Sequence, residues 1–238
     1  IGDGEPRVSG HTIFRAIVPM TEVPERLRWN AVSLWSGPKW HFVHYPIASG
    51  KYMNLAATID NQAQQAVTGE PVDALTVQDT FSELADTAKQ LMKLGSDWKK
   101  WVLCDRDSVP NWTEGRVALL GDAAHPMLQY AAQGACMALE DAVVLGNTLK
   151  NVTANNVVDY LKEYNHLRVG RTARVMDTAR FMGEKIYHAS GKAAQQRNEQ
   201  LRAMTSNDIH QVVSWLHGLR PPFIDELHSS DLEVKKIA

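Results

Sequence analysis

Residues 116–126, with the sequence RVALLGDAAHP, constrain the fold more strongly than any other part of the chain. The first five form a short, continuous, mostly apolar run, which is typical of a strand buried on both faces. Gly121 and Asp122 then make a sharp turn, because glycine adopts backbone conformations that other residues avoid. Pro126 follows, and a helix is expected to open around Gln133-Gly134. The segment therefore predicts a strand, a tight polar turn and a helix in direct succession.

The composition excludes several classes of protein. The chain has 238 residues, 44% of them hydrophobic, which is enough to bury a sizeable core. The net charge of −2 gives no electrostatic case for binding nucleic acid or an anionic membrane. There is no apolar run long enough to span a membrane, and no signal-peptide pattern. Cys104 and Cys136 form no C-x-x-C pair or His/Cys cluster, so we expect no metal site and a reducing, cytoplasmic location.

The order of the expected elements indicates an α/β (α+β) fold. The first third alternates in polarity and predicts an antiparallel sheet of about four strands. The second half is helical and contains no internal repeat. Strands are expected over residues 8–19, 31–35, 40–46, 52–59 and 116–120, and helices over 76–94, 132–150, 155–187 and 191–204.

Three regions follow from this order. Residues 1–100 are expected to form a sheet domain with a covering helix. Residues 101–150 carry the strand, the Gly-Asp turn and the helix that follows it. Residues 151–238 form a C-terminal helical region, which ends in an apolar cluster over residues 212–216 that packs on the body or on a second subunit.

The Gly-Asp turn has a chemistry that suits a cofactor. Asp122, at the end of a buried strand, can hydrogen-bond a sugar-like hydroxyl, and the free N–H groups at the following helix start favour electron-rich groups. A Gly-Asp turn is common, however, and Glu140 and Asp141 taken alone indicate a solvated helix face. The occurrence of all these features at this spacing favours the cofactor interpretation.

The same residues resemble a known motif. Gly121-Asp122-Ala-Ala-His-Pro126, followed by Gly134 and then by Leu-Glu-Asp-Ala at 139–142, is similar to the second flavin-binding motif of the class A flavoprotein monooxygenases. The resemblance implies that Asp122 contacts the ribityl part of FAD. It also implies that the flavin ring lies beside residues 126–135, which include Pro126, Gln133, Gly134 and Ala135.

The other flavin motifs of that family do not occur in this sequence. Gly2-Asp3-Gly4 imitates the start of G-x-G-x-x-G, but Arg7 stands where the third glycine is required and no strand precedes it. The resemblance therefore implies a p-hydroxybenzoate-hydroxylase-like fold that lacks its N-terminal βαβ unit. We expect an upstream FAD-binding segment, in the same protein or on a separate chain, to supply the ADP side of the site.

Residues 40–46 carry the candidate substrate site. Side chains alternate along a strand, so His41, Val43 and Tyr45 share one face while His44 lies on the other. Together with Gln129, just after the Gly-Asp motif, this pattern is closest within the family to the 3-hydroxybenzoate 6-hydroxylases. A histidine packed against Trp35 or Trp40 is the alternative interpretation of His41.

The resemblance implies a reaction. Reduced FAD, formed with NADH or NADPH, reacts with O₂ to give a C4a-hydroperoxide, which hydroxylates an electron-rich ring. His41 would take the phenol proton, Gln129 would bind the same oxygen and Tyr45 would fix the substrate. The expected product from 3-hydroxybenzoate is 2,5-dihydroxybenzoate (gentisate).

Two alternatives stay open. The first is a monooxygenase of the same family that acts on salicylate or a hydroxynicotinate. The second is a flavin-free remnant that serves as a binding or assembly module, for which the absent ADP motif is the best support. Arginines at 168, 171 and 174 are interleaved with acidic residues and predict a solvated or subunit-contact helix. Because the family is often dimeric, we expect a homodimer.

Overall fold

The computed structural model describes residues 6–217, which form two compact units. The first, here called the sheet unit, comprises residues 6–105 and 181–199. The second, here called the helical unit, comprises residues 106–180 and 200–217. Within the described residues no helix is both long and apolar enough to cross a membrane.

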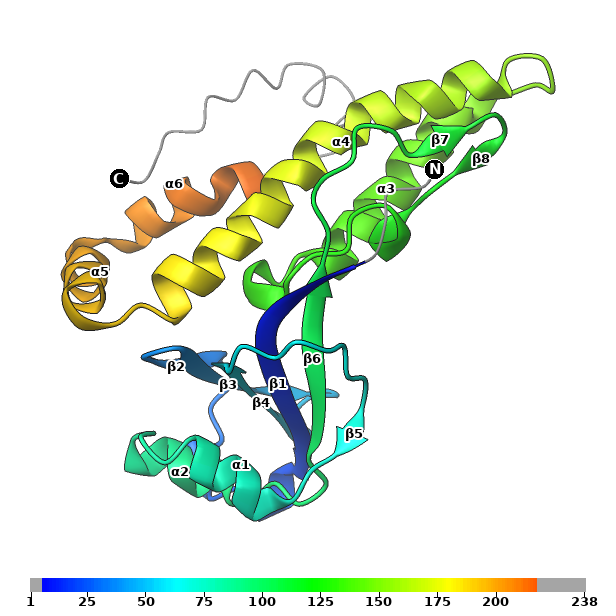
Figure 1. Cartoon of the computed structure of the whole chain (residues 1–238). Coiled ribbons are helices and arrows are strands. Elements are labelled where there is room, and N and C mark those ends of the chain that lie inside the picture. The colour runs from blue at the N-terminus through cyan, green and yellow to red at the C-terminus, as the bar shows by residue number, and fades with distance from the viewer. Residues whose placement is uncertain (1–5, 218–238) are drawn as a thin grey trace. The chain divides into compact units, whose positions relative to one another are not determined.

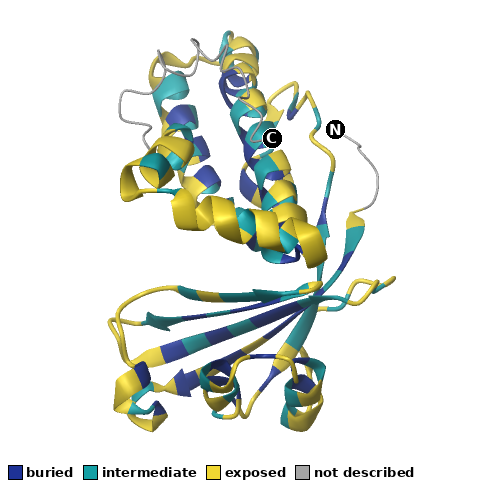
Figure 2. Ribbon diagram, turned by 90° about the vertical axis from the view of Figure 1, so that its left-hand side faces the viewer, coloured by how far each residue is buried: buried dark blue, intermediate teal, exposed yellow. Residues whose placement is uncertain are grey.

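The sheet unit is built on six antiparallel strands in the order β2-β3-β4-β1-β6-β5. Four of them, β1 to β4, correspond to the four predicted strands, and the other two extend the sheet beyond β1. Figure 2 shows buried positions recurring along the strands, as expected for a sheet with distinct faces. The strands are β1 (Arg7–Pro19), β2 (Ser33–Gly37), β3 (Trp40–Ile47), β4 (Tyr52–Asp60), β5 (Glu70–Pro71) and β6 (Lys99–Asp105).

Two short helices, α1 (Ala74–Thr80) and α2 (Asp86–Met92), cover one face of this sheet (Figure 1). The fully buried core between them includes Phe42, Leu55 and Phe81. The single helix predicted over residues 76–94 is wrong, because the chain leaves the helix after Thr80 and re-enters it at Asp86. Thr80 and Ser82 are weak helix formers, and tighter turns replace the helical bonds there.

The helical unit contains the long helices and one two-stranded ribbon. The ribbon pairs β7 (Thr113–Glu114) with β8 (Val117–Ala118). The prediction of a strand buried on both faces over residues 116–120 is wrong for the described residues. The strand there, β8, is two residues long, and its Val117 is 59% exposed. A strand needs neighbours on both edges and cover on both faces to be buried, and β8 pairs with β7 alone.

The predicted helices of the second half are confirmed, with one addition and one change. The addition is α6, whose Leu216 packs with Trp215 against Met137 and Val175, whereas Val212 of the predicted apolar cluster is 41% exposed. The change is a π-helical turn after α4. The helices are α3 (Gly134–Thr148), α4 (Val157–Phe181), α5 (Gly191–Ala203) and α6 (Ser206–His217), with the π turn at Met182–Tyr187. Short 3-10 turns lie at Met20–Glu22, Glu25–Leu27, Gly121–Ala123, Gln129–Ala131 and Leu149–Asn151.

Candidate functional site

The Gly-Asp turn of the helical unit is a 3-10 turn, Gly121–Ala123, that directly follows an extended Leu120. Gly121 is buried and has φ +59°, a conformation that favours glycine. A Cβ at this position would lie 3.3 Å from the Cβ of Ala138, so a side chain there would also crowd α3. Asp122, the next residue, is exposed. The sequence therefore presents a carboxylate at the surface of a tightly fixed turn.

The start of α3 lies beside this carboxylate. A Cβ added to Gly134 would be 3.9 Å from Asp122 Oδ1. Gln133 is buried and precedes the helix, but its side chain makes no capping hydrogen bond to the first N–H groups of α3. Ala132 reaches the helix through a left-handed conformation at φ +52°. The first backbone N–H groups of α3 and the carboxylate of Asp122 thus form one polar surface with both acceptors and donors.

Asp141, on the buried face of α3, holds this surface in place. Its Oδ2 accepts hydrogen bonds from the backbone N–H of Gly121 at 3.0 Å and from Nε2 of His125 at 2.6 Å. Its other oxygen, Oδ1, accepts from Nε of Arg168 on α4 at 2.6 Å. Both ends of the Gly-Asp-Ala-Ala-His segment are therefore tied to one carboxylate, which is fully buried.

A second acid completes the network. Glu140 accepts from Nη1 of Arg168 at 2.8 Å, and it binds Arg171 through both of its carboxylate oxygens at 2.7 Å. Burial alone would raise the pKa of Asp141, but the hydrogen bond from His125 and the charge of Arg168 outweigh it and lower the pKa. Asp141 is thus ionised and paired at neutral pH.

This network bears on two interpretations made from the sequence. Glu140 and Asp141 do not form the solvated helix face that they indicate when taken alone, because Asp141 is fully buried. The solvated or subunit-contact role expected for the arginines of α4 is wrong for Arg168, which is also fully buried. Arg168 lies on the buried stripe of α4 that includes Leu161, Tyr164 and Val175. A charged residue on an apolar helix stripe was the available signal of a buried partner.

His41 lies in the sheet unit, on the face of β3 opposite to α1 and α2. The sheet face that α1 and α2 cover holds Phe42, whose side chain is fully buried. His41 is 3% exposed, and its Nδ1 is 2.9 Å from Nε2 of His188. Its ring lies 5.0 Å from that of Tyr187. These contacts replace the packing on Trp35 or Trp40 that was the alternative interpretation.

His44 occupies the other face of the same strand, as predicted. It is buried, and its ring stacks on Trp35 at 6.4 Å and lies 5.6 Å from Phe42. Among the described residues, Nε2 of His44 has no hydrogen-bond partner. Burial lowers its pKa. His44 is therefore a packing residue of the core.

The pKa values of the histidines on the His41 face are also lowered. Burial, together with the neighbouring His188 and His11, lowers the pKa of His41 to about 3. Burial and His11 lower the pKa of His188 to about 4, against an opposing effect of Asp60. Both rings are consequently neutral at pH 7, and each is a weaker base than an exposed histidine.

The remaining predicted residues are placed as follows. Tyr45 is partly buried and shares the strand face of His41. Gln129 is partly buried in the 3-10 turn Gln129–Ala131, and Pro126 is partly buried before it. Ala135 is exposed in the first turn of α3. Because Gln129 belongs to the helical unit and His41 to the sheet unit, a joint site of these residues stays a prediction.

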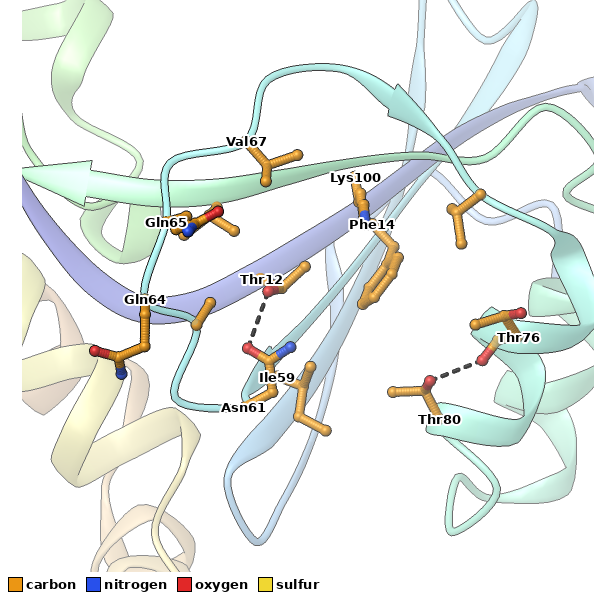
Figure 3. Close-up of a pocket in the computed structure, with 13 residues that line it drawn as sticks. Thr12, Phe14, Ile59, Asn61, Gln64, Gln65, Val67, Thr76, Thr80 and Lys100 are labelled. Atoms are coloured by element: carbon orange, nitrogen blue, oxygen red, sulfur yellow. Dashed lines mark hydrogen bonds between the residues drawn. The ribbon is translucent and has the colours of Figure 1, made fainter.

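A pocket of about 620 Å³ lies elsewhere in the sheet unit, between β1, α1 and the segment before β5 (Figure 3). Thr12 donates to Asn61 at 2.9 Å inside it, and Thr80 donates to the carbonyl of Thr76. None of the predicted site residues lines it. Its lining is mostly amide, hydroxyl and apolar, with Lys100 near Glu70, so we assign it no reaction. Across residues 6–217 no cluster of three His, Cys, Asp or Glu side chains could hold a metal ion.

The fold and the anchored Gly-Asp turn together define part of a nucleotide-cofactor site of the flavoprotein kind. The family model described as "FAD binding domain" matches residues 21–179. The chain belongs to this family, and its predicted resemblance to the class A flavoprotein monooxygenases is confirmed.

Three known proteins illustrate the similarity. The chain is 49% identical to 3-hydroxybenzoate 6-hydroxylase 1 of Aquipseudomonas alcaligenes, over 92% of this chain and 55% of the relative. It is 44% identical to 3-hydroxybenzoate 6-hydroxylase 2 of the same organism, over 90% and 66%. A salicylate hydroxylase substrate complex matches with a TM-score of 0.81 at 24% identity, over 95% and 58%. The chain thus spans about half to two thirds of the length of these relatives.

Proposed function

We propose that the complete protein is an FAD-dependent hydroxylase that converts 3-hydroxybenzoate to 2,5-dihydroxybenzoate with NADH or NADPH and O₂. The observation that carries this proposal is the buried Asp141 network, which holds a Gly-Asp turn beside an uncapped helix start. The names of the two A. alcaligenes relatives support the choice of substrate. A homodimer and a cytoplasmic location remain predictions of the family resemblance.

The residues of the helical unit fit FAD. Asp122 offers an exposed carboxylate for the ribityl hydroxyls, and the N–H groups at the start of α3 suit the polar edge of the flavin ring. Gly121, Pro126, Gln133, Gly134 and Ala135 shape this surface. When bound, the flavin supplies the activation of O₂, which is chemistry that protein side chains lack.

The ADP side of the site requires a further FAD-binding segment. Four large apolar side chains on β8, after it and on α3 are exposed, and such a segment would have them available as contacts. One lies on β8, one follows β8, and two lie four residues apart on α3. These side chains are Val117, Leu120, Leu139 and Val143, which are 59%, 38%, 69% and 46% exposed. We propose that the upstream segment covers them.

His41, Tyr45 and Gln129 form the proposed substrate site. A phenolate ring is more electron-rich than a phenol ring at the positions ortho and para to its oxygen, so loss of the phenol proton promotes hydroxylation. His41 is neutral at pH 7, so one of its ring nitrogens is unprotonated, and we propose that it takes the phenol proton even though its surroundings in the chain without substrate lower its pKa to about 3. Gln129 would hydrogen-bond the same oxygen, and Tyr45, on the face of His41, would fix the substrate.

The cofactor site is tested by Asp122→Ala in the complete protein. Loss of a hydrogen bond to a charged group costs about 1.5–3 kcal/mol, so we expect FAD to bind roughly 10- to 150-fold more weakly. Quenching of flavin fluorescence gives the dissociation constant. Asp159→Ala, at an 83% exposed carboxylate of α4, is the matched control. Equal affinities in both variants and the wild type would contradict the assignment of Asp122.

The substrate site is tested by His41→Ala. Positioned acid–base groups contribute about 10²–10⁴-fold to a rate, so we expect a loss of that size in hydroxylation of 3-hydroxybenzoate. Product formation is measured by chromatography, and the exposed His210→Ala serves as the control. Unchanged turnover in His41→Ala would show that His41 has no part in the reaction, although the cofactor site could still stand.

A further inference from the structure

His188 shares a hydrogen bond with His41 that couples the two rings. Nδ1 of His41 and Nε2 of His188 are 2.9 Å apart. Since both rings are neutral at pH 7, one proton lies between the two nitrogens, and only one of them donates. When Nδ1 of His41 donates, Nε2 of His41 carries a lone pair. The tautomer of His41 is therefore linked to that of His188.

The backbone fixes His188 in this position. Its N–H donates to the carbonyl of Gly183 at 3.0 Å, which closes the π-helical turn after α4. Its own carbonyl accepts from the N–H of Lys39 at 3.4 Å, just before β3 begins. π-helical turns within helices occur frequently at functional sites. Here the turn brings the ring of His188 against β3, two residues beyond Lys39.

We propose that His188 is a positioning residue for His41: it fixes the orientation and tautomer of that ring, and it takes up the proton that passes through His41. This inference rests on the proposed function, in which His41 accepts the phenol proton. It extends the site to a residue just beyond the π turn that follows α4, which no flavin or substrate motif contains.

The proton transfer balances without an oxidant. The phenol O–H bond breaks and its proton binds Nε2 of His41, while the proton on Nδ1 of His41 moves to Nε2 of His188. The substrate becomes a phenolate, His41 stays neutral in its other tautomer, and His188 becomes an imidazolium. No electron is transferred in this step.

The surroundings lower the pKa of both rings but disfavour a proton less on His188, at about 4, than on His41, at about 3. His188 is 9% exposed, against 3% for His41, and the Asp60 carboxylate on β4 acts to raise its pKa. His11 on β1 lowers the pKa of both rings. Burial lowers the pKa of His11 itself, against the opposing effects of Asp60, Glu184 and Asp105. The Tyr187 ring lies against His41, and burial raises the pKa of that phenol, so it stays uncharged.

Ionisation of bound substrate tests this inference in the FAD-loaded complete protein. Ultraviolet difference spectra of oxidised enzyme with 3-hydroxybenzoate, recorded across pH, give the pH at which the bound phenol is half ionised. We expect His188→Leu to raise this pH by at least about one unit relative to wild type, which is a tenfold change. His188→Gln retains an acceptor for Nδ1 of His41 but cannot take a proton. This variant should bind 3-hydroxybenzoate as tightly as wild type does, but the bound phenol should not ionise as it does in wild type.

Two controls separate positioning from folding. Benzoate, which lacks the phenol, should bind wild type and both variants equally. His44→Phe removes a buried histidine from the opposite face of β3 and should leave ionisation unchanged. Half-ionisation at the same pH in wild type and His188→Gln would overturn the inference even if His188→Leu fails to fold. If wild type bound benzoate and 3-hydroxybenzoate without ionising the phenol, the proposed function itself would fail.

Discussion

The two units bury polar groups in opposite ways. In the helical unit, Asp141 and Arg168 are fully buried as charged partners with several hydrogen bonds each. In the sheet unit, His41 and His188 are nearly as buried but are neutral. A buried charge pair is costly to break, whereas a neutral imidazole pair can gain or lose a proton. We therefore call the Asp141–Arg168 pair of the helical unit the anchor, because it holds the Gly-Asp turn in place. The His41–His188 pair of the sheet unit is instead a candidate site of proton transfer.

The contributions of Asp141 and of the buried histidines to stability respond differently to a fall in pH. The pKa of Asp141 lies below its usual value, so its contribution to stability is present above that value and is lost only as the pH falls through the folded pKa. The histidines behave differently, because the unfolded chain takes up their protons from about pH 6.5. A moderate fall in pH should therefore lower the stability of the sheet unit before it weakens the Asp141–Arg168 pair.

The largest expected effect comes from breaking the anchor. Arg168→Met leaves the Asp141 carboxylate buried without its main cationic partner, and such changes cost about 3–5 kcal/mol. Urea unfolding at pH 7 measures the free energy of unfolding. Lys162→Met, which removes a 68% exposed charge from the same helix, should change it by less than about 0.5 kcal/mol. If both variants lost the same free energy of unfolding, the proposed role of Arg168 as the buried partner of Asp141 would be refuted.

Acidification should produce the next effect. His41 remains neutral in the folded chain down to a pKa of about 3, so stability falls as the pH drops from 6.5 towards that value. By pH 4 the loss is on the order of 3 kcal/mol. His41→Gln, which cannot titrate, should lose less between pH 7 and pH 4 in urea unfolding. A variant with the same pH dependence as wild type would show that His41 is not buried in its neutral form.

The smallest effect is expected at His44. Its Nε2 has no partner among the described residues, and its ring packs between aromatic side chains, so a phenyl ring should replace it well. We expect His44→Phe to change the free energy of unfolding at pH 7 by less than about 1 kcal/mol, or to increase it. Thermal unfolding checks this. A loss of several kcal/mol would mean that His44 makes a polar contact in solution.

Local patterns in the sequence were sufficient for much of the fold. Alternation predicted β1 to β4 and the opposite faces of His41 and His44, because side-chain direction in a strand depends on position alone. The break between α1 and α2 was missed, since Val77 to Leu91 keep a helical spacing across it. The short β8 was predicted as a buried strand because an apolar run does not reveal whether neighbouring strands are present.

The site was predictable where a motif is contiguous. Asp122 and Gly134 were found because the turn and helix follow each other in sequence. The Arg168–Asp141 pair joins residues 27 positions apart on two helices, and the His41–His188 pair joins residues 147 positions apart. Partners at such separations leave no local pattern, so only the three-dimensional structure reveals that the second half of the motif anchors the first.

The most direct test of the account is substrate-stimulated oxidation of NADH by the complete, FAD-loaded protein. We predict that 3-hydroxybenzoate accelerates NADH consumption and yields 2,5-dihydroxybenzoate, while salicylate and a hydroxynicotinate give less product. Faster turnover of salicylate or a hydroxynicotinate would be consistent with the proposed FAD site but would contradict 3-hydroxybenzoate as the substrate. A protein that neither retains FAD nor oxidises NADH faster with any of these aromatics would contradict the account and favour a binding or assembly module.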